Sequence, residues 1–165
     1  MTAPREHCSG LVSNIEQSPG GIEICDSSVP RQVLALTCNS TLMDVRTSMI
    51  RVERFMKALG ASAELTDDLN LVLSEAMTNI ARYAYPHGDG LIECFIHKSP
   101  DTVECILSDQ GKGFDPSKFV PHLPDPALAP EGGFGLFLIG SLTRELKYYR
   151  NNGVNTLRFV LPAIA

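Results

Sequence analysis

This 165-residue sequence has no long apolar run and no apolar leader. No stretch approaches the roughly 20 consecutive apolar residues that a membrane-spanning helix needs. Residues 1–7 lack the apolar core of a signal peptide. We therefore expect a protein that stays in the cytoplasm and makes no use of a membrane.

Clusters of positive charge are missing as well. The 14 Lys and Arg are outnumbered by 19 Asp and Glu, the formal net charge is -5, and no run of Lys or Arg occurs. Proteins that bind nucleic-acid phosphates use such basic patches. We therefore expect no direct contact with nucleic acid.

The cysteines lack the CxxC spacing that is typical of zinc sites. Their odd number also argues against the disulfide framework of a secreted protein. We expect small buried thiols in a reducing compartment. The five are Cys8, Cys25, Cys38, Cys94 and Cys105.

The composition is that of a folded domain, with 44% hydrophobic and 20% charged residues. The length suits one domain with its own core. Residues 1–30 carry scattered Ser, Pro and Gly without sustained periodicity. They are predicted to be an N-terminal extension, and residues 31–165 the folded domain.

Periodicity predicts a strand over 33–38 and a helix that begins at the capping residues 39–41 and ends before Gly60. A second helix is predicted from an N-cap at Thr66 to the stop at residues 86–88. Its core-facing stripe should contain Leu69, Leu73, Ala76, Ile80 and Tyr83.

Two hairpins follow from alternating apolar residues and turn signals. In the first, over 91–98 and 102–108, we expect Lys98 to pair with Asp101, and Cys94 with Cys105. The second joins 146–150 to 154–161 through an Asn-Asn-Gly turn, after a helix that begins near Gly135. This order predicts an α+β fold, a two-layer sandwich with helices on one face of a largely antiparallel sheet.

Three short motifs could carry chemistry. In the first, Glu75 and Asn79 are four residues apart, so they project from one helix face. A carboxylate can accept a proton, and an amide oxygen can bind Mg²⁺. Alone, this ExxxN pattern also fits a solvated helix face on which Glu75 and Arg82 make surface contacts.

The second motif, DxGxG, comes directly after an apolar strand. Asp109 could accept the exocyclic amine of adenine, while Gly111 and Gly113 would let the backbone approach a flat base. An ordinary Gly-rich turn is the alternative.

The third motif is the loop and helix start around Gly133, Gly135 and Leu136. Glycines at such a junction expose backbone N–H groups that bind phosphate. No Gly-Lys-Ser/Thr follows, so it is not a P-loop, and no strand precedes it, so it is not a Rossmann motif. A helix start that is Gly-rich only for close packing remains the alternative.

In combination and in this order, the motifs resemble the N, G1 and G2 boxes of the gyrase, histidine-kinase and MutL (GHKL) ATPase superfamily, with its Bergerat-type ATP-binding fold. The closer likeness is to bacterial anti-sigma factor serine/threonine kinases of the general-stress and sporulation type. It rests on residues 73–79, on Ala84 and Tyr85, and on residues 131–136, and it spans about residues 33–161.

The resemblance implies a role for each motif residue. Glu75 would be the general base for a partner's serine hydroxyl, and Asn79 would hold Mg²⁺ against the phosphates of ATP. Asp109 would bind adenine. The remaining residues would shape the adenine end (Gly111, Gly113) and line the phosphate side (Gly133, Gly135, Leu136), under a lid formed by residues 115–131.

The resemblance also implies partners, namely an anti-sigma factor antagonist of the STAS type, a sigma factor and a second copy of the chain. Two functions stay open: a kinase that phosphorylates the antagonist, and a nucleotide-dependent binding module. Glu75 favours the kinase. The module is favoured by Glu131, where some relatives carry Arg, and by the absence of Lys and Arg from residues 120–130. A histidine kinase fits less well, because no long helix with a phosphoacceptor His precedes Val33.

Overall fold

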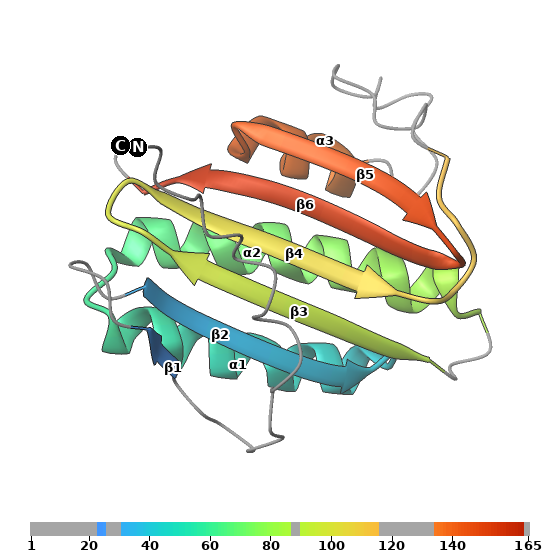
Figure 1. Ribbon diagram of the computed structural model, residues 1–165, viewed down its shortest axis with the longest axis horizontal. Coiled ribbons are helices and arrows are strands. Elements are labelled where there is room, and N and C mark those ends of the chain that lie inside the picture. Colours follow the sequence, from blue (N-terminus) through green and yellow to red (C-terminus); the bar gives the residue numbers. More distant parts are fainter. Residues whose placement is uncertain (1–22, 26–30, 87–89, 116–133, 164–165) are drawn as a thin grey trace, which may run out of the picture.

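A computed structural model describes residues 23–25, 31–86, 90–115 and 134–163. This part of the chain contains one sheet of strand order β1-β2-β3-β4-β6-β5, in which every neighbouring pair is antiparallel. The helices α1, α2 and α3 all cover the same face of it (Figure 1), which confirms the predicted two-layer α+β sandwich. The elements in chain order are β1 (Glu23–Cys25), β2 (Arg31–Asn39), α1 (Leu42–Ala58), α2 (Ala63–Asn79), the π-helix η1 (Ile80–Ala84), β3 (Leu91–Lys98), β4 (Thr102–Asp109), α3 (Phe134–Leu142), β5 (Glu145–Asn151) and β6 (Val154–Pro162).

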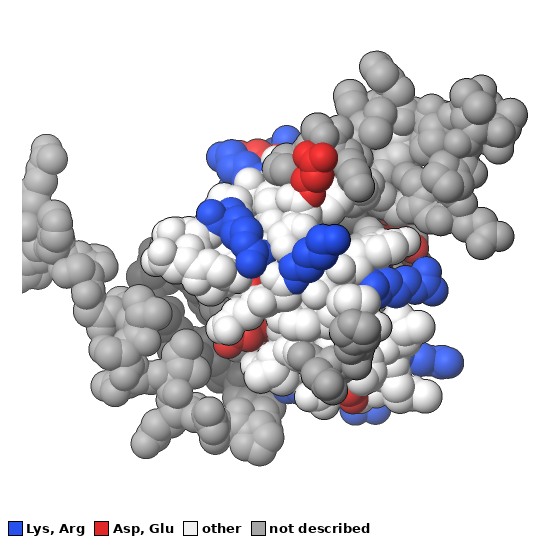
Figure 2. Space-filling view, turned by 90° about the vertical axis from the view of Figure 1, so that its right-hand side faces the viewer, with Lys and Arg blue, Asp and Glu red and all other residues white. Residues whose placement is uncertain are grey.

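Several chain segments meet at one end of the sandwich. The end of β4, the turn from β5 to β6 and the end of α2 all lie on the right-hand side of Figure 1. Figure 2 looks onto this end and shows Lys and Arg side chains spread over it. The segments that meet here carry three exposed cationic side chains, those of Arg82, Lys112 and Arg150.

The first helix forms where its capping residues predict. The side chain of Thr41 accepts a hydrogen bond from the backbone N–H of Asp44 at 3.1 Å, which satisfies one free donor of the first turn. At the other end Gly60 has a φ of 66°, a left-handed conformation that glycine adopts without steric cost. The predicted helix bounds are therefore confirmed.

The second helix begins a turn earlier than the sequence predicts. Its N-cap is Ser62, whose side chain accepts a hydrogen bond from the N–H of Leu65 at 3.2 Å. Thr66, the predicted cap, is buried inside the helix and donates its hydroxyl to the carbonyl of Ser62 at 2.8 Å. That prediction was wrong because Ser62, four residues earlier, is also a capping residue, and it precedes Leu65, the first buried apolar residue of the helix.

The predicted core stripe fails at its last residue. Leu69, Leu73 and Ala76 are buried, but Tyr83 is 59% exposed. The backbone changes to a π-helix over Ile80–Ala84, and its wider turn rotates the residues that follow. Ala81 is the buried residue of this segment instead.

The first hairpin pairs two residues away from the predicted register. Lys98 lies opposite Val103, Ile96 opposite Cys105, and Cys94 opposite Leu107. The turn is closed by Ser99 and Thr102, whose backbone groups bond at 2.8 Å around a two-residue loop. Because the shift is an even number of residues, the predicted buried face is correct even though the partners are not.

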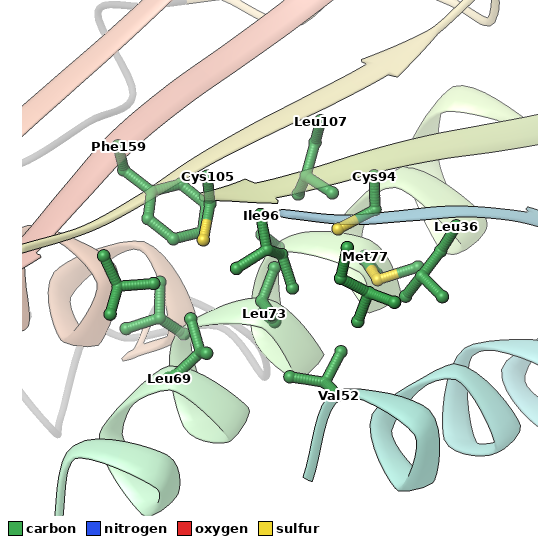
Figure 3. Close-up of a cluster of buried hydrophobic side chains, with 14 of the residues drawn as sticks. Leu36, Val52, Leu69, Leu73, Met77, Cys94, Ile96, Cys105, Leu107 and Phe159 are labelled. Carbon is green, nitrogen blue, oxygen red and sulfur yellow. The ribbon is translucent and has the colours of Figure 1, made fainter. Parts of the chain in front are cut away.

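The core lies between the sheet and the helices (Figure 3), where Leu69, Leu73, Val52 and Ile96 are fully buried. Each such side chain contributes about 1.5–3 kcal/mol through the removal of apolar surface from water. Two of the expected buried thiols, Cys94 and Cys105, are among these core residues. Burial raises the pKa of the Cys94 thiol to about 12, so it stays protonated and unreactive near neutral pH.

The second hairpin forms as predicted. Asn152 and Gly153 have φ values of 49° and 84°, the left-handed pair that a tight type I′ turn requires. Its strand β6 lies between β4 and β5 in the sheet.

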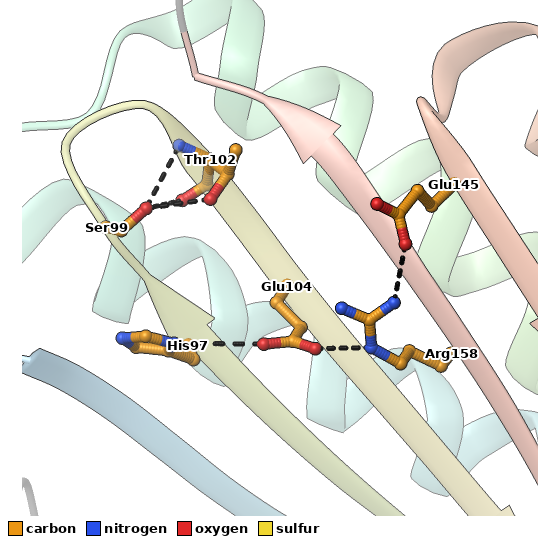
Figure 4. A network of polar contacts seen from close by, with 6 residues as sticks. All are labelled: His97, Ser99, Thr102, Glu104, Glu145 and Arg158. Atoms are coloured by element: carbon orange, nitrogen blue, oxygen red, sulfur yellow. Dashed lines mark hydrogen bonds and ion pairs between the residues drawn. The ribbon is translucent and has the colours of Figure 1, made fainter.

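The opposite face of the sheet carries no helix among the described elements. A row of polar contacts crosses it instead (Figure 4), with Arg158 between Glu104 at 2.5 Å and Glu145 at 2.8 Å. At the sheet edge, β1 pairs with β2, although it belongs to residues 1–30, which the sequence predicts to be an extension. In the described part of the chain, no helix is both long and apolar enough to cross a bilayer.

Candidate functional site

The ExxxN motif lies at the end of α2. Glu75 and Asn79 are one helical turn apart, and both side chains are half-buried, so this is not the open helix face that the alternative interpretation supposed. Asn79 is the last residue of α2, directly before the π-helical turn. Single π-turns often occur at functional sites, because they redirect the side chains on either side.

The start of α3 lies against these two side chains. A Cβ atom added at Gly135 would overlap the carboxylate of Glu75 and would lie 3.6 Å from the amide nitrogen of Asn79. Glycine permits this approach without any displacement of the Glu75 carboxylate. The structure therefore brings the first and third motifs into direct contact, although 60 positions separate their residues 75 and 135.

The other residues of the third motif are placed less completely. Leu136 is half-buried and packs against the hydrophobic core, so its contact with a ligand stays a prediction. Gly133 lies outside the described residues, as does nearly all of the expected lid at residues 115–131.

The second motif lies on the end of the same helix. A Cβ at Gly111 would come within 2.6 Å of the carbonyl oxygen of Ala84. The next residue, Lys112, donates its backbone N–H to that oxygen at 3.0 Å. The loop after β4 is thus attached to the π-helical turn that follows Asn79.

Asp109 is a buried carboxylate at the end of β4, only 7% exposed. The described residues donate two hydrogen bonds to it, from the N–H of Gly111 and from Nδ2 of Asn155, each at 2.8 Å. Both reach Oδ1. This arrangement fixes the carboxylate through Oδ1, whereas no donor among the described residues reaches Oδ2.

The sequence did not reveal the residues that hold Asp109. Asn155 lies opposite it on β6, and its Oδ1 accepts hydrogen bonds from Tyr148 at 2.9 Å and from Arg150. Arg150 also donates to the carbonyl of Gly111 at 2.9 Å. Asn155 does not stand out in the sequence, because its strand also contains Thr156 and Arg158, and its partner becomes visible only once the register is known.

The remaining residue of the second motif is also confined. A Cβ at Gly113 would lie 3.1 Å from Cδ of Arg150, so a side chain there would require a small shift of the arginine. The tyrosine that binds Asn155 also accepts the backbone N–H of Phe114, at 2.9 Å. The whole Asp-x-Gly-x-Gly loop is therefore ordered by side chains of β5 and β6.

The fold and these contacts together define a class of protein. An α+β sandwich with a buried strand-end Asp, a Gly-rich loop and a helical Glu and Asn beside a Gly-led helix is the arrangement of a Bergerat-type nucleotide-binding domain. Residues 38–161 match the family described as the histidine kinase-like ATPase domain. The chain belongs to this family.

The chain is also similar in sequence to individual proteins. The chain is 35% identical over 103 residues to the Serine-protein kinase RsbW of Staphylococcus aureus strain Newman. It is equally similar to the protein of that name in the bovine strain RF122/ET3-1. Each match covers 58% of this chain and 65% of the relative, so the chain spans slightly less than two thirds of the length of these relatives.

A solved structure shares the fold. The crystal structure of the RsbU and RsbW domains of Rv1364c from Mycobacterium tuberculosis aligns with a TM-score of 0.56 at 16% sequence identity. The alignment covers 80% of this chain and 32% of that chain.

Proposed function

We propose that this chain is a serine/threonine protein kinase of the anti-sigma factor type, which uses Mg-ATP to phosphorylate an anti-sigma factor antagonist and which also sequesters a regulatory partner. The observation that carries the proposal is that the three motifs meet around the end of α2 and the π-helical turn η1 that follows it. Gly135 contacts Glu75, and the loop after Asp109 contacts Ala84. A turn-forming or packing role for each motif separately would not require them to converge.

Each side chain then has one task. Asp109 accepts the adenine amine through the oxygen that its protein donors leave available. Glu75 accepts the proton of the partner's serine hydroxyl while that oxygen bonds to the terminal phosphorus of ATP and the bond to ADP breaks. The helix start at Gly135 presents backbone N–H groups to the phosphates.

The residues present fit a magnesium ion. Mg²⁺ takes few protein ligands and keeps phosphate and water oxygens for the rest, and when bound it neutralises phosphate charge. Asn79 would hold it through its amide oxygen, because its side chain makes no capping hydrogen bond and lies beside the Gly135 backbone. Glu75, one turn away, stays available for the proton.

The partners follow from the proposed class. The relatives named serine-protein kinase RsbW support a protein serine as the group that is phosphorylated. An antagonist of the STAS type is the protein that would carry this serine. A sigma factor is the second partner, a homodimer the working assembly, and the cytoplasm the compartment.

A second function is supported by a different observation. Residues 120–130, within the expected lid, contain no Lys or Arg to stabilise charge on the transferred phosphoryl group. The chain would then be a nucleotide-dependent module that captures a partner without useful catalysis.

One experiment separates the two. The full chain is incubated with Mg²⁺, ATP labelled at the terminal phosphate, and a purified STAS-type antagonist, and phosphoserine is measured on the antagonist. The kinase predicts transfer of label to serine that requires Mg²⁺. Capture of the antagonist or of a sigma factor that depends on nucleotide, without any transfer, would replace the kinase with the binding module.

A further inference from the structure

The phenol of Tyr85 joins three segments at the end of α2. Its oxygen accepts a hydrogen bond from the backbone N–H of Gln110 at 2.7 Å and donates one to the carbonyl of Leu91 at 3.4 Å. Gln110 directly follows Asp109. One side chain therefore connects the π-helical turn, the start of β3 and the loop that begins at the predicted adenine carboxylate.

The ring of Tyr85 packs directly against the backbone of a glycine. A Cβ atom at Gly90 would overlap the ring carbons, so the ring lies directly on the Gly90 backbone. Burial raises the pKa of the Tyr85 phenol above its ordinary value, so the hydroxyl keeps its proton at physiological pH. A neutral phenol can accept from Gln110 and donate to Leu91 at the same time, whereas a phenolate could only accept.

A second bond fixes the other side of the same loop. Ala84 accepts the N–H of Lys112 at 3.0 Å, and the absence of a side chain at Gly111 permits that approach. The two bonds, to Gln110 and to Lys112, hold the loop on both sides of Gly111. Both come from residues that follow Asn79 within one or two turns.

The loop is also held from the opposite side, but those contacts do not reach the helix. Tyr148, Arg150 and Asn155 bind the loop from β5 and β6. Among the hydrogen bonds of the described residues, those of Ala84 and Tyr85 connect the loop to the end of α2. Tyr85 is the one of the two that acts through a side chain, so it can be changed without altering the backbone.

We propose that Tyr85 is a positioning residue, which sets the place of the Asp109 carboxylate relative to Asn79 and so couples the adenine end of the nucleotide site to its metal and phosphate end. The inference rests on the proposed function. Its consequence is specificity: the phenol contributes to the preference for a base that carries an amine, although it does not touch the base.

The test compares ATP with inosine triphosphate, which has an oxygen in place of the adenine amine. Affinities of both are measured by calorimetry for the wild-type full chain, for Tyr85→Phe, and for Tyr83→Phe as a matched control. Phenylalanine keeps the ring on Gly90 and removes only the hydroxyl. Tyr83 lies two residues before Tyr85, in the π-helical turn, and is 59% exposed.

Loss of one hydrogen bond that orders the loop should lower the preference for ATP over inosine triphosphate by about 2- to 10-fold in Tyr85→Phe. Tyr83→Phe should keep the wild-type preference. Amide hydrogen exchange of the nucleotide-free protein should show loss of protection at Gln110 in Tyr85→Phe alone.

A purely structural role would give a different result. Tyr85→Phe would then unfold at a lower temperature but bind both nucleotides with the wild-type ratio, and that outcome overturns the inference. If the wild type binds neither nucleotide, the proposed function fails instead. Hydrogen exchange still decides the loop contact in that case, since retained protection at Gln110 in Tyr85→Phe would refute it.

Discussion

At the scale of single residues, the site depends on a carboxylate that is fixed before a ligand arrives. Asn155 and the N–H of Gly111 hold one oxygen of Asp109, and Tyr148 and Arg150 hold Asn155 in turn. Such a chain of polar contacts, buried at Asp109 and Asn155, keeps an acceptor in place at little entropic cost on binding. Nucleotide affinity should therefore respond sharply to small changes at Asp109.

Asp109→Asn should weaken the binding of ATP and ADP, which we expect at micromolar affinity in the wild type, by roughly 10- to 100-fold. The new amide can present a donor to the adenine amine and loses the charge that strengthens the bond. Calorimetric titration measures the effect, with Asp67→Asn on the exposed side of α2 as the control. Unchanged affinity in Asp109→Asn would mean that adenine is bound elsewhere.

Asn79→Ala should abolish most of the increase in ATP affinity that Mg²⁺ provides, because the amide oxygen is the proposed protein ligand. Titrations with and without Mg²⁺ give the ratio, and Thr78→Ala on the same turn is the control. An equal Mg²⁺ effect in Asn79→Ala and in the wild type would make Asn79 an ordinary helix residue.

At the scale of elements, the close contact between α2 and the start of α3 depends on the absence of a side chain at position 135. Glycine at position 135 lets the start of α3 reach Glu75. The atom in the way of a side chain is the end of the flexible Glu75, so a larger residue would displace the carboxylate and leave the helix backbone in place. The same helix carries Gly140, where an added Cβ meets nothing within 4 Å.

These two glycines give a matched pair of variants. Gly135→Ala should leave the fold intact and lower phosphoryl transfer by up to about 10²-fold, since a base displaced by about 1 Å loses its alignment. Gly140→Ala should keep full transfer and gain about 0.5–1 kcal/mol of stability, as expected for Gly→Ala inside a helix. Transfer rates and thermal unfolding measure both. Equal transfer in the two variants would contradict the placement of Glu75 at the reacting centre.

Elements are also the scale at which sequence reasoning was most informative. Alternation and capping predicted both hairpins and α1, because those signals depend on neighbouring residues. The π-turn after Asn79 was not predictable, since nothing local distinguishes it from α-helix, and it moved Tyr83 to the surface. The observed register of the first hairpin differs from the predicted register by two residues, because the turn geometry decides whether Ser99 or Lys98 closes the turn.

At the scale of the whole molecule, the order of the three motifs led to the hypothesis that they share one site, which no motif predicts alone. The predicted site residues were Glu75, Asn79, Asp109, Gly111, Gly113, Gly133, Gly135 and Leu136, and their roles stay predictions. The structure places Gly135 against Glu75, and Gly111 and Lys112 against Ala84 in the π-helical turn that follows α2. Asn155 and Tyr148 were missed, and Tyr85 was used for the resemblance alone, because each reaches the loop from a separate element through tertiary contacts. The boundary between residues 1–30 and 31–165 stays a prediction, and β1 on the sheet edge makes its position worth testing by truncation.

The measurement that tests the central claim most directly separates catalysis from binding at Glu75. Glu75→Gln keeps the shape of the side chain but cannot accept a proton. The full chain with this change should bind nucleotide and capture its partner nearly as the wild type does, while phosphoryl transfer to the partner serine falls by about 10²-fold or more. Glu64→Gln, in the exposed first turn of the same helix, should change neither property. Loss of binding and transfer together in Glu75→Gln would show that Glu75 supports the fold, and undiminished transfer would show that the base lies elsewhere.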